Sequence, residues 1–139
     1  MIHLITGTPG SGKTLYAVSK IIEYTKQNEK LLQEGKEPRN IYSDIDGLNI
    51  DGVEPAPDDW RETPEGPIIF YDDIQQRNEF KKSRFENEVC DALQVHRHTG
   101  HDIYGITQFP VLLHPNFRAV VGIHLHLHRG WGLTAATVY

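Results

Sequence analysis

The sequence predicts a single α/β domain with a mostly parallel central sheet flanked by helices and ending in a β-hairpin. Short apolar segments alternate with segments of helical apolar spacing along the 139 residues. Parallel strands need a crossover between them, so this alternation indicates a parallel sheet. A glycine-rich loop joins the first apolar segment to the first helical one. The last two apolar segments are separated only by a short glycine-containing turn, which is typical of a hairpin.

The first half of the chain predicts two strands, one helix and a long connection. Residues 2–6 form an apolar run stopped by glycine, and residues 14–27 place apolar side chains at helical spacing. Residues 26–38 are charged and end in glycine and proline, so we expect a solvated turn of the same helix or a connection. Residues 40–43 predict a brief strand. Residues 44–67, rich in glycine and proline, predict mostly loop.

The second half predicts a buried strand, a helix and three further strands. The run 68–71 is entirely apolar or aromatic, as a buried parallel strand would be. Residues 85–98 have helical spacing and precede a glycine, and residues 102–107 return to a strand pattern. The segment 122–128 alternates strictly between apolar residues and histidines. A turn at positions 129 to 132 then leads to a last predicted strand, residues 133–139.

Composition excludes several classes of protein. The single Cys90 cannot form an internal disulfide, so the sequence fits a reducing compartment. The net charge is −5 and the pI about 5.9. This acidic balance lacks the global attraction of a basic nucleic-acid binder, so no direct nucleic-acid binding is expected, although a local basic patch is compatible with it. No apolar run is long enough to span a membrane. The chain ends directly after a strand-like run, so we expect a domain from a longer protein.

The strongest motif is a phosphate-binding loop. Residues 7–14 satisfy every fixed position of the pattern Gly-x-x-x-x-Gly-Lys-Thr. Backbone N–H groups and the start of the next helix attract phosphate, Lys13 reaches the β and γ phosphates, and the Thr14 hydroxyl binds Mg²⁺. A chance glycine-rich turn is the competing interpretation, but the strand before and the helix after favour the phosphate loop. The predicted ATP-binding residues are Gly7, Thr8, Pro9, Gly10, Ser11, Gly12, Lys13 and Thr14.

Two aspartates follow the apolar strand 68–71. Asp72 has the position of the Walker B carboxylate, which holds Mg²⁺ in P-loop enzymes, and a turn residue at a strand end is the alternative. Asp73 lies where many ATPases of the additional-strand type place a glutamate that polarises the attacking water. Aspartate is one methylene shorter, so a capping or magnesium-supporting role for Asp73 is an equal alternative. Glu79 is a weaker candidate for the base.

Two further candidates depend on the position of the strand 102–107. Gln108 ends this strand and could contact the γ phosphate if the strand lies between the other two; an exposed strand-end residue is the alternative. Strand carboxyl ends gather at the nucleotide edge of such sheets. We therefore expect Arg118, Arg77 and Arg84 to begin near that edge. Arg118 is the candidate for an arginine that bridges subunits, with a surface arginine as the alternative.

Three histidines share one face of the strand 122–128. His124, His126 and His128 are spaced by two residues, so neighbouring side chains could together bind zinc. No cysteine or carboxylate pattern nearby completes a zinc site. We therefore interpret them as a polar sheet face or an interface.

With these motifs in place, the sequence resembles the N-terminal domain of zonula occludens toxin (Zot) proteins, a family that includes filamentous-phage assembly proteins. The resemblance rests on the phosphate loop, on residues 70–75 and most specifically on residues 96–110, which run from His-Arg-His to Thr-Gln-Phe-Pro. It implies an additional-strand P-loop ATPase on the cytoplasmic side of the inner membrane. A transmembrane segment and an extracytoplasmic tail would follow. It also implies ring-like self-association, phage assembly partners and ATP-driven virion export.

The resemblance also assigns residues. It implies that Lys13 and Thr14 bind phosphate and Mg²⁺, that Asp72 is the Walker B acid and that Gln108 occupies the sensor position. Asp73 departs from the glutamate common at its place, which leaves hydrolysis open.

The leading hypothesis is an ATP-hydrolysing motor domain for filamentous-phage assembly and export. Two alternatives use the same loop. One is a nucleotide-gated structural domain that binds ATP without hydrolysing it. The other is a small-molecule kinase, for which residues 44–67 would have to act as a lid.

Overall fold

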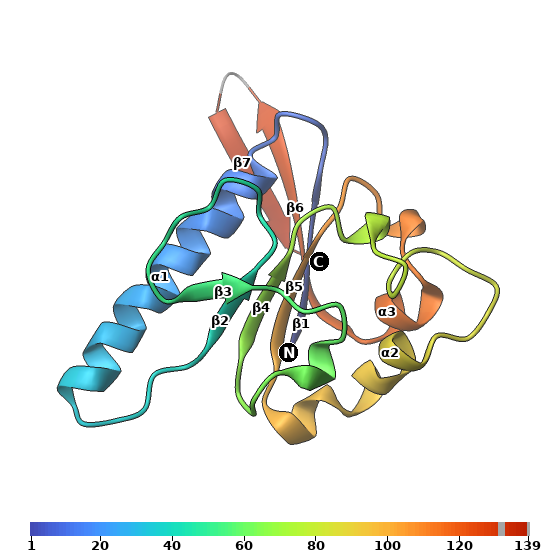
Figure 1. The fold of residues 1–139 in the computed structure, drawn as a ribbon. Coiled ribbons are helices and arrows are strands. Elements are labelled where there is room, and N and C mark those ends of the chain that lie inside the picture. The colour runs from blue at the N-terminus through green and yellow to red at the C-terminus, as the bar shows by residue number, and fades with distance from the viewer. Residues whose placement is uncertain (131–132, 139) are drawn as a thin grey trace.

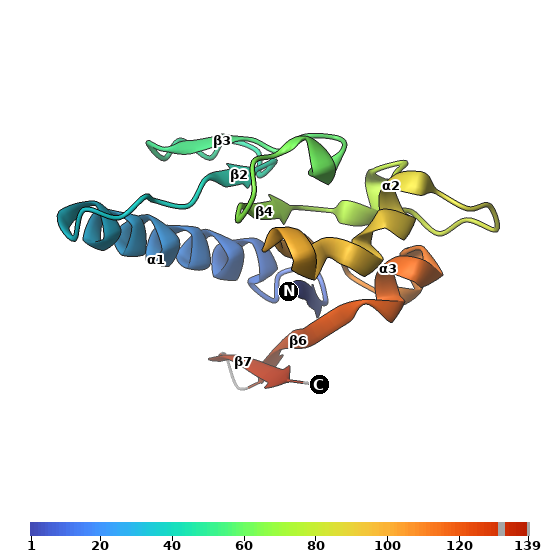
Figure 2. The same cartoon turned by 90° about the horizontal axis from the view of Figure 1, so that it is seen from below.

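A seven-stranded sheet organises the computed structural model, which describes residues 1–130 and 133–138 (Figure 1). The strand order is β3-β2-β4-β5-β1-β6-β7, and every neighbouring pair is parallel except β6 and β7. Figure 2 shows the sheet from below, with β3 and β7 at opposite edges. The strands are β1 (Ile2–Gly7), β2 (Ile41–Ser43), β3 (Val53–Pro55), β4 (Ile68–Tyr71), β5 (Asp102–Ile106), β6 (Val121–Gly130) and β7 (Leu133–Val138).

Helices cover both faces of the sheet, as the sequence predicted. The long helix α1 lies on one side of the strands, and the shorter helical segments lie on the other (Figures 1 and 2). The helices are α1 (Lys13–Gln33), α2 (Glu88–Asp91) and α3 (Pro115–Ala119), with 3₁₀ segments at Trp60–Glu62, Ile74–Gln76, Ala92–Thr99 and Pro110–Leu112. Alternate strand residues supply the two cores: Ile68 and Phe70 of β4 face the α1 side, whereas Ile69 and Tyr71 face α2 and α3.

Helix α1 extends beyond the predicted 14–27 into the charged segment 26–38, which is the first of the two alternatives expected for that segment. It buries Ala17 and Ile21 against the sheet and continues through the charged segment to residue 33. Apart from Asn28, residues 26–33 are Glu, Lys, Gln and Leu, which are all strong helix formers, so the segment remains helical while largely exposed. The helix ends at Gln33, and the φ of 73° at Gly35, two residues later, allows the Lys36 N–H to bond the Leu31 carbonyl at 2.8 Å.

The predicted helix 85–98 was wrong in its bounds and its type. Asn87 accepts hydrogen bonds from the backbone N–H groups of Val89 and Cys90, so the helix cannot begin before it. Only one α-helical turn, α2, follows. The chain then continues as the 3₁₀ segment Ala92–Thr99, which ends at Gly100 as predicted, with a φ of 68°.

The connection 44–67 is more ordered than a loop. It contributes β3 to the sheet edge, and its 3₁₀ segment buries Trp60, whose indole N–H donates to the Val89 carbonyl at 2.8 Å. The connection therefore packs on the domain and does not form a free lid.

The C-terminal hairpin is confirmed, because β6 pairs antiparallel with β7 from Leu125↔Val138 to Gly130↔Leu133. Positions 131 and 132 of the predicted turn, and position 139 of the predicted strand, lie outside the described residues. Within the described part of the chain, no helix is long and apolar enough to cross a membrane.

Candidate nucleotide-binding site

The predicted phosphate loop connects the carboxyl end of β1 to the start of α1. Gly10 and Gly12 have φ angles of 76° and 91°, in the left-handed region that glycine adopts without strain. The Ser11 N–H bonds back to the Thr8 carbonyl at 3.1 Å, which closes the loop. The loop thus brings backbone N–H groups and the positive end of a 21-residue helix to one point.

Gly7 is required by packing rather than by its backbone angles. A Cβ atom here would clash with the Ser11 hydroxyl and lie 2.7 Å from the Leu127 carbonyl oxygen. The Ser11 hydroxyl is itself buried and has no hydrogen-bond partner among the described residues. The floor of the loop is therefore closely packed and retains an unused polar group, as expected at a site for an anionic ligand.

Lys13 folds back over the loop. Its ammonium group donates to the carbonyl oxygens of Gly7 and Thr8, at 2.8 and 3.1 Å. The positive charge is thus held against the loop that would bind phosphate.

Thr14 and Asp72 meet across the site, although 58 residues separate them in the sequence. The Thr14 hydroxyl donates to Asp72 Oδ2 at 3.4 Å, which joins the start of α1 to the end of β4. A hydroxyl and a carboxylate are oxygen ligands of the kind Mg²⁺ prefers. Burial raises the pKa of Asp72, and the carboxylates of Asp73 and Asp44 raise it further. A cation bound beside Asp72 would offset the repulsion among these carboxylates and favour the ionised form of Asp72.

Asp44 supports this arrangement and was not predicted. It follows β2, and its Oδ1 accepts the backbone N–H of Asp72 at 2.5 Å. Its Oδ2 accepts from the Arg77 guanidinium at 3.0 and 2.9 Å, and Arg77 also reaches Asp58. Burial raises the pKa of Asp44, although these hydrogen bonds oppose the shift. The available signal was the position of Asp44 at the carboxyl end of a predicted strand.

A cavity of about 300 Å³ lies beside the Thr14–Asp72 pair. It contains the exposed Asp73, whose φ of 47° turns the chain sharply after β4. The candidate Glu79 does not line this cavity. The lining residues are Asp44, Asp46, Asp72, Asp73, Gln76 and Arg77.

Gln108 lies two residues beyond the end of β5, and β5 lies between β4 and β1. This is the condition that its prediction as a sensor required. The preceding Thr107 has a buried hydroxyl without a hydrogen-bond partner in the described part of the chain. Strand β5, which separates β1 from β4, is thus followed by polar groups on the same edge of the sheet as the phosphate loop.

Arg118 is not near that edge, contrary to the expectation. It occupies the last turn of α3, and β6 begins three residues later at Val121, opposite Ile2 at the start of β1. Helix α3 carries the chain back to the amino edge of the sheet, so Arg118 is exposed there, away from the phosphate loop of its own chain. Of the predicted arginines, Arg77 is the one that lines the cavity beside Asp72.

Two of the three predicted histidines of β6, His124 and His126, bond to the strand that leads into the loop. The buried Thr6 hydroxyl lies 2.6 Å from His124 Nε2 and 2.8 Å from His126 Nδ1. Burial and the neighbouring His126 lower the pKa of His124. Within residues 1–130 and 133–138, no three His, Cys, Asp or Glu side chains come together as metal ligands.

The fold is similar to that of two solved proteins. The crystal structure of the N-terminal domain of zonular occludens toxin from Neisseria meningitidis superposes with a TM-score of 0.77 at 30% identity, covering 99% of this chain and 82% of that one. The genome packaging NTPase B204 of Sulfolobus turreted icosahedral virus 2, in complex with AMPPCP, has a TM-score of 0.64 at 15% identity, covering 93% and 75%. These matches confirm the P-loop type of fold.

Sequence comparison identifies the family. ORF301 of Pseudomonas phage Pf3, which carries the name of an assembly protein, is 44% identical over 149 residues, covering 100% of this chain. The chain spans 46% of the length of that relative. The profile of the family named Zonular occludens toxin matches residues 1–63 and 55–137. The chain therefore belongs to the zonular occludens toxin (Zot) family.

Proposed function

We propose that this domain binds MgATP and hydrolyses it to power filamentous-phage assembly. The observation that carries the proposal is the Thr14–Asp72 hydrogen bond beside a loop already capped by Lys13. Thr14 of the phosphate loop and Asp72 of the Walker B motif are thus in contact with each other. The Mg²⁺ ion, when bound, would neutralise charge on the phosphates.

Each residue has a role in this proposal. Lys13 and the backbone N–H groups of residues 7–14 bind the phosphates, while Thr14 and Asp72 hold the metal. Asp73 orients the attacking water, because it is exposed at the cavity beside Asp72. Gln108 follows β5, the strand that lies between β1 and β4, and senses the γ phosphate.

The wider role is proposed from the family and from the phage relative. The full-length protein would be anchored on the cytoplasmic face of the inner membrane, assemble as a ring and drive virion export with other phage assembly proteins. Arg118 lies at the amino edge of the sheet, so in such a ring it could serve only the site of a neighbouring subunit. Of the alternatives, the kinase is not favoured, because residues 44–67 pack on the domain as β3 and a 3₁₀ segment.

Magnesium-dependent release of phosphate from ATP, measured against protein concentration, tests the proposal. We expect turnover that is lost in Lys13→Ala, with specific activity that rises with concentration if a neighbouring subunit completes the site. The same measurement on the full-length, membrane-bound protein is the more stringent test. Tight ATP binding without phosphate release, in both the domain and the full-length protein, would indicate a nucleotide-gated structural domain instead of a motor. Transfer of phosphate to an added acceptor without free phosphate would indicate a kinase.

A further inference from the structure

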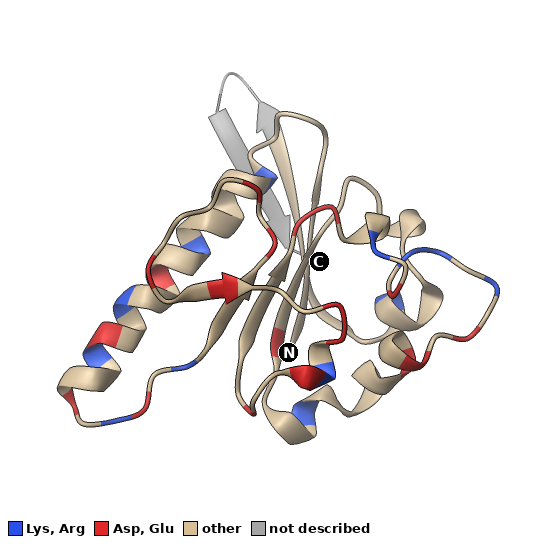
Figure 3. Cartoon of the chain, viewed as in Figure 1, with Lys and Arg blue, Asp and Glu red and all other residues tan. Residues whose placement is uncertain are grey.

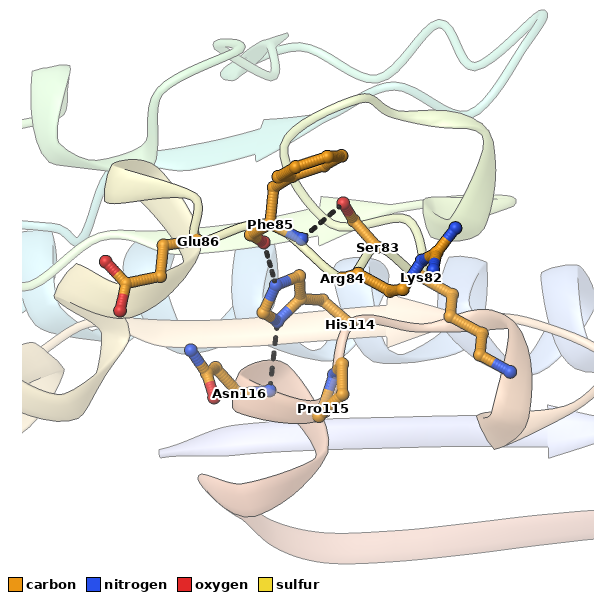
Figure 4. A pocket seen from close by; sticks show the side chains of 8 residues that line it. All are labelled: Lys82, Ser83, Arg84, Phe85, Glu86, His114, Pro115 and Asn116. Carbon is orange, nitrogen blue, oxygen red and sulfur yellow. Dashed lines mark hydrogen bonds between the residues drawn. The ribbon is translucent and has the colours of Figure 1, made fainter.

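A second cavity lies outside the nucleotide site. It has a volume of about 730 Å³ and is lined by residues 82–86 together with His114, Pro115 and Asn116 (Figure 4). We call it the basic hollow, because residues 81–86 carry three cations, Lys81, Lys82 and Arg84, against one carboxylate, Glu86; Lys81 is next to the lining and the others are part of it. Figure 3 shows this basic stretch between β4 and α2, in a chain whose net charge is −5.

The wall of the basic hollow is fixed by hydrogen bonds. The Asn116 N–H donates to His114 Nδ1 at 3.1 Å, so the proton of the neutral ring is on Nε2, which donates to the Phe85 carbonyl at 3.0 Å. The Lys82 N–H donates to the Leu112 carbonyl at 2.9 Å, and the His114 N–H donates to the Phe80 carbonyl at 2.8 Å. The exposed side chains thus project from a backbone tied to the segment that follows Gln108.

The charged groups of this stretch are not engaged by the part of the chain that the structure describes. Lys81, Lys82 and Arg84 are exposed, and none of them forms an ion pair with the described residues. At physiological salt, exposed charges more than about 8 Å from a bound ligand are largely screened. The charges next to the cavity therefore decide whether it attracts an anion or a cation. The local sign here is positive.

An exposed aromatic ring lies among these cations. Phe85 is 81% exposed, although burying such a side chain would stabilise the fold by roughly 1.5–3 kcal/mol. Single exposed apolar residues are ordinary, so Phe85 is of interest because its ring lines the same cavity as Lys82 and Arg84.

We propose that the basic hollow binds single-stranded nucleic acid. Lys82 and Arg84 contact phosphates, and a base stacks on the ring of Phe85. Positive charge combined with an exposed aromatic ring is the combination that recognises unpaired bases on a polyanion. A duplex offers no free base faces to the ring. The proposal departs from the expectation drawn from net charge, because within residues 81–86 the three cations outnumber the single carboxylate of Glu86.

Fluorescence anisotropy of the 139-residue chain with 5′-labelled dT20 tests the proposal without ATP, so the outcome is independent of hydrolysis. We expect saturable binding. Contacts to two or three phosphates would make log K fall with log salt with a slope of about −1.4 to −2.1. The paired variant Lys82→Glu, Arg84→Glu should weaken binding at least about tenfold and flatten this slope. Phe85→Ala should weaken it by about fivefold to a hundredfold, and Phe85→Tyr should retain it.

The matched control is Lys26→Glu, Lys30→Glu, which makes the same charge change at exposed positions of α1. It should bind dT20 within about twofold of wild type. Equal loss in both paired variants would overturn the proposal, because only net charge would then matter. Wild-type affinity in Phe85→Ala, equal affinity for a 20-base-pair duplex, or binding to phosphatidylserine vesicles with none to dT20 would also overturn it.

Discussion

The carboxylate of Asp44 holds the backbone of Asp72 across the ends of β2 and β4, with 2.5 Å between Asp44 Oδ1 and the Asp72 nitrogen. Its other oxygen accepts from Arg77. Asp72 in turn accepts from Thr14. Asp44 is therefore a positioning residue for the proposed metal site, and its role is separable from that of Asp72 by mutation.

Replacing Asp44 should disturb both the fold and metal-dependent binding. Asp44→Ala removes the partner of the Asp72 N–H and the more buried partner of Arg77. We expect the free energy of unfolding to fall by about 1–3 kcal/mol, measured by urea denaturation. Mg²⁺-dependent ATP affinity should fall with it. Asp46→Ala, an exposed aspartate of the same cavity, should stay within about 0.5 kcal/mol. Equal effects of the two variants would argue against a positioning role.

Lys13→Ala should abolish ATP binding with little effect on the fold. Hydrogen bonds to charged groups are worth about 1.5–3 kcal/mol each, so loss of the ammonium should weaken ATP binding by at least about tenfold per phosphate contact. Isothermal titration calorimetry measures this directly. Lys26→Ala, an exposed position on the same helix, should bind ATP as wild type does. Retained affinity in Lys13→Ala would remove the lysine from the site.

Asp73→Asn should leave ATP binding intact and stop turnover. The amide keeps the size of the side chain but cannot accept a proton from water. Glu79→Gln is the comparison, because Glu79 does not line the cavity beside Asp72. It should retain most of the phosphate release. Equal turnover in Asp73→Asn and wild type would exclude Asp73 as the base, and loss only in Glu79→Gln would transfer that role to Glu79.

The raised pKa of Asp72 predicts a pH-dependent stability in the absence of Mg²⁺. Burial first, and then the Asp73 and Asp44 carboxylates, place the folded-state pKa above the unfolded value of about 3.9. The ionised form therefore costs the native state, and this cost grows as pH rises from the unfolded pKa through the folded pKa. Asp72→Asn should thus be more stable than wild type at pH 7, with the difference shrinking towards pH 4. Urea unfolding at both pH values measures it. A difference independent of pH would contradict the assignment.

Thr6→Val should destabilise the junction of β1 and β6. The substitution keeps the shape but removes the hydroxyl bonded to His124 and His126. We expect a loss of about 1–3 kcal/mol in the free energy of unfolding, because the hydroxyl is buried. Thr25→Val removes a hydroxyl that bonds only within α1, to the Ile22 carbonyl, so it should change stability by less than about 1 kcal/mol. Equal losses would mean that the histidine contacts add nothing.

The strands and the phosphate loop could be predicted because their signals are local. Apolar runs ending in Gly7 and Asp72 fix two strands, and the loop pattern fixes the edge of the sheet they share. The bounds of helices could not be predicted as well. Residues 26–33 are mostly polar, so the sequence left open whether they continue the helix or form a connection; their helix propensity extends α1. The apolar spacing of residues 85–98 did not reveal that Asn87 caps the helix or that 3₁₀ bonding follows.

The candidate site was predictable where a local sequence motif fixes the position of its residues. Thr14 and Asp72 meet as the two motifs imply. Asp44 was missed because its role depends on β2 lying beside β4, which no local pattern states. Arg118 was misplaced because strand order along the chain does not reveal where a short crossover returns to the amino edge. Long-range pairing decides both cases.

Strand β5 ends between β1 and β4, the strands that precede the phosphate loop and Asp72. Residues 114–116, in the segment that follows β5, form a wall of the basic hollow. One stretch of backbone therefore adjoins two places where phosphate groups would bind. Any coupling carried by that stretch is thermodynamically reciprocal. The factor by which bound nucleotide changes the affinity of the hollow for its ligand equals the factor by which that ligand changes the affinity for nucleotide.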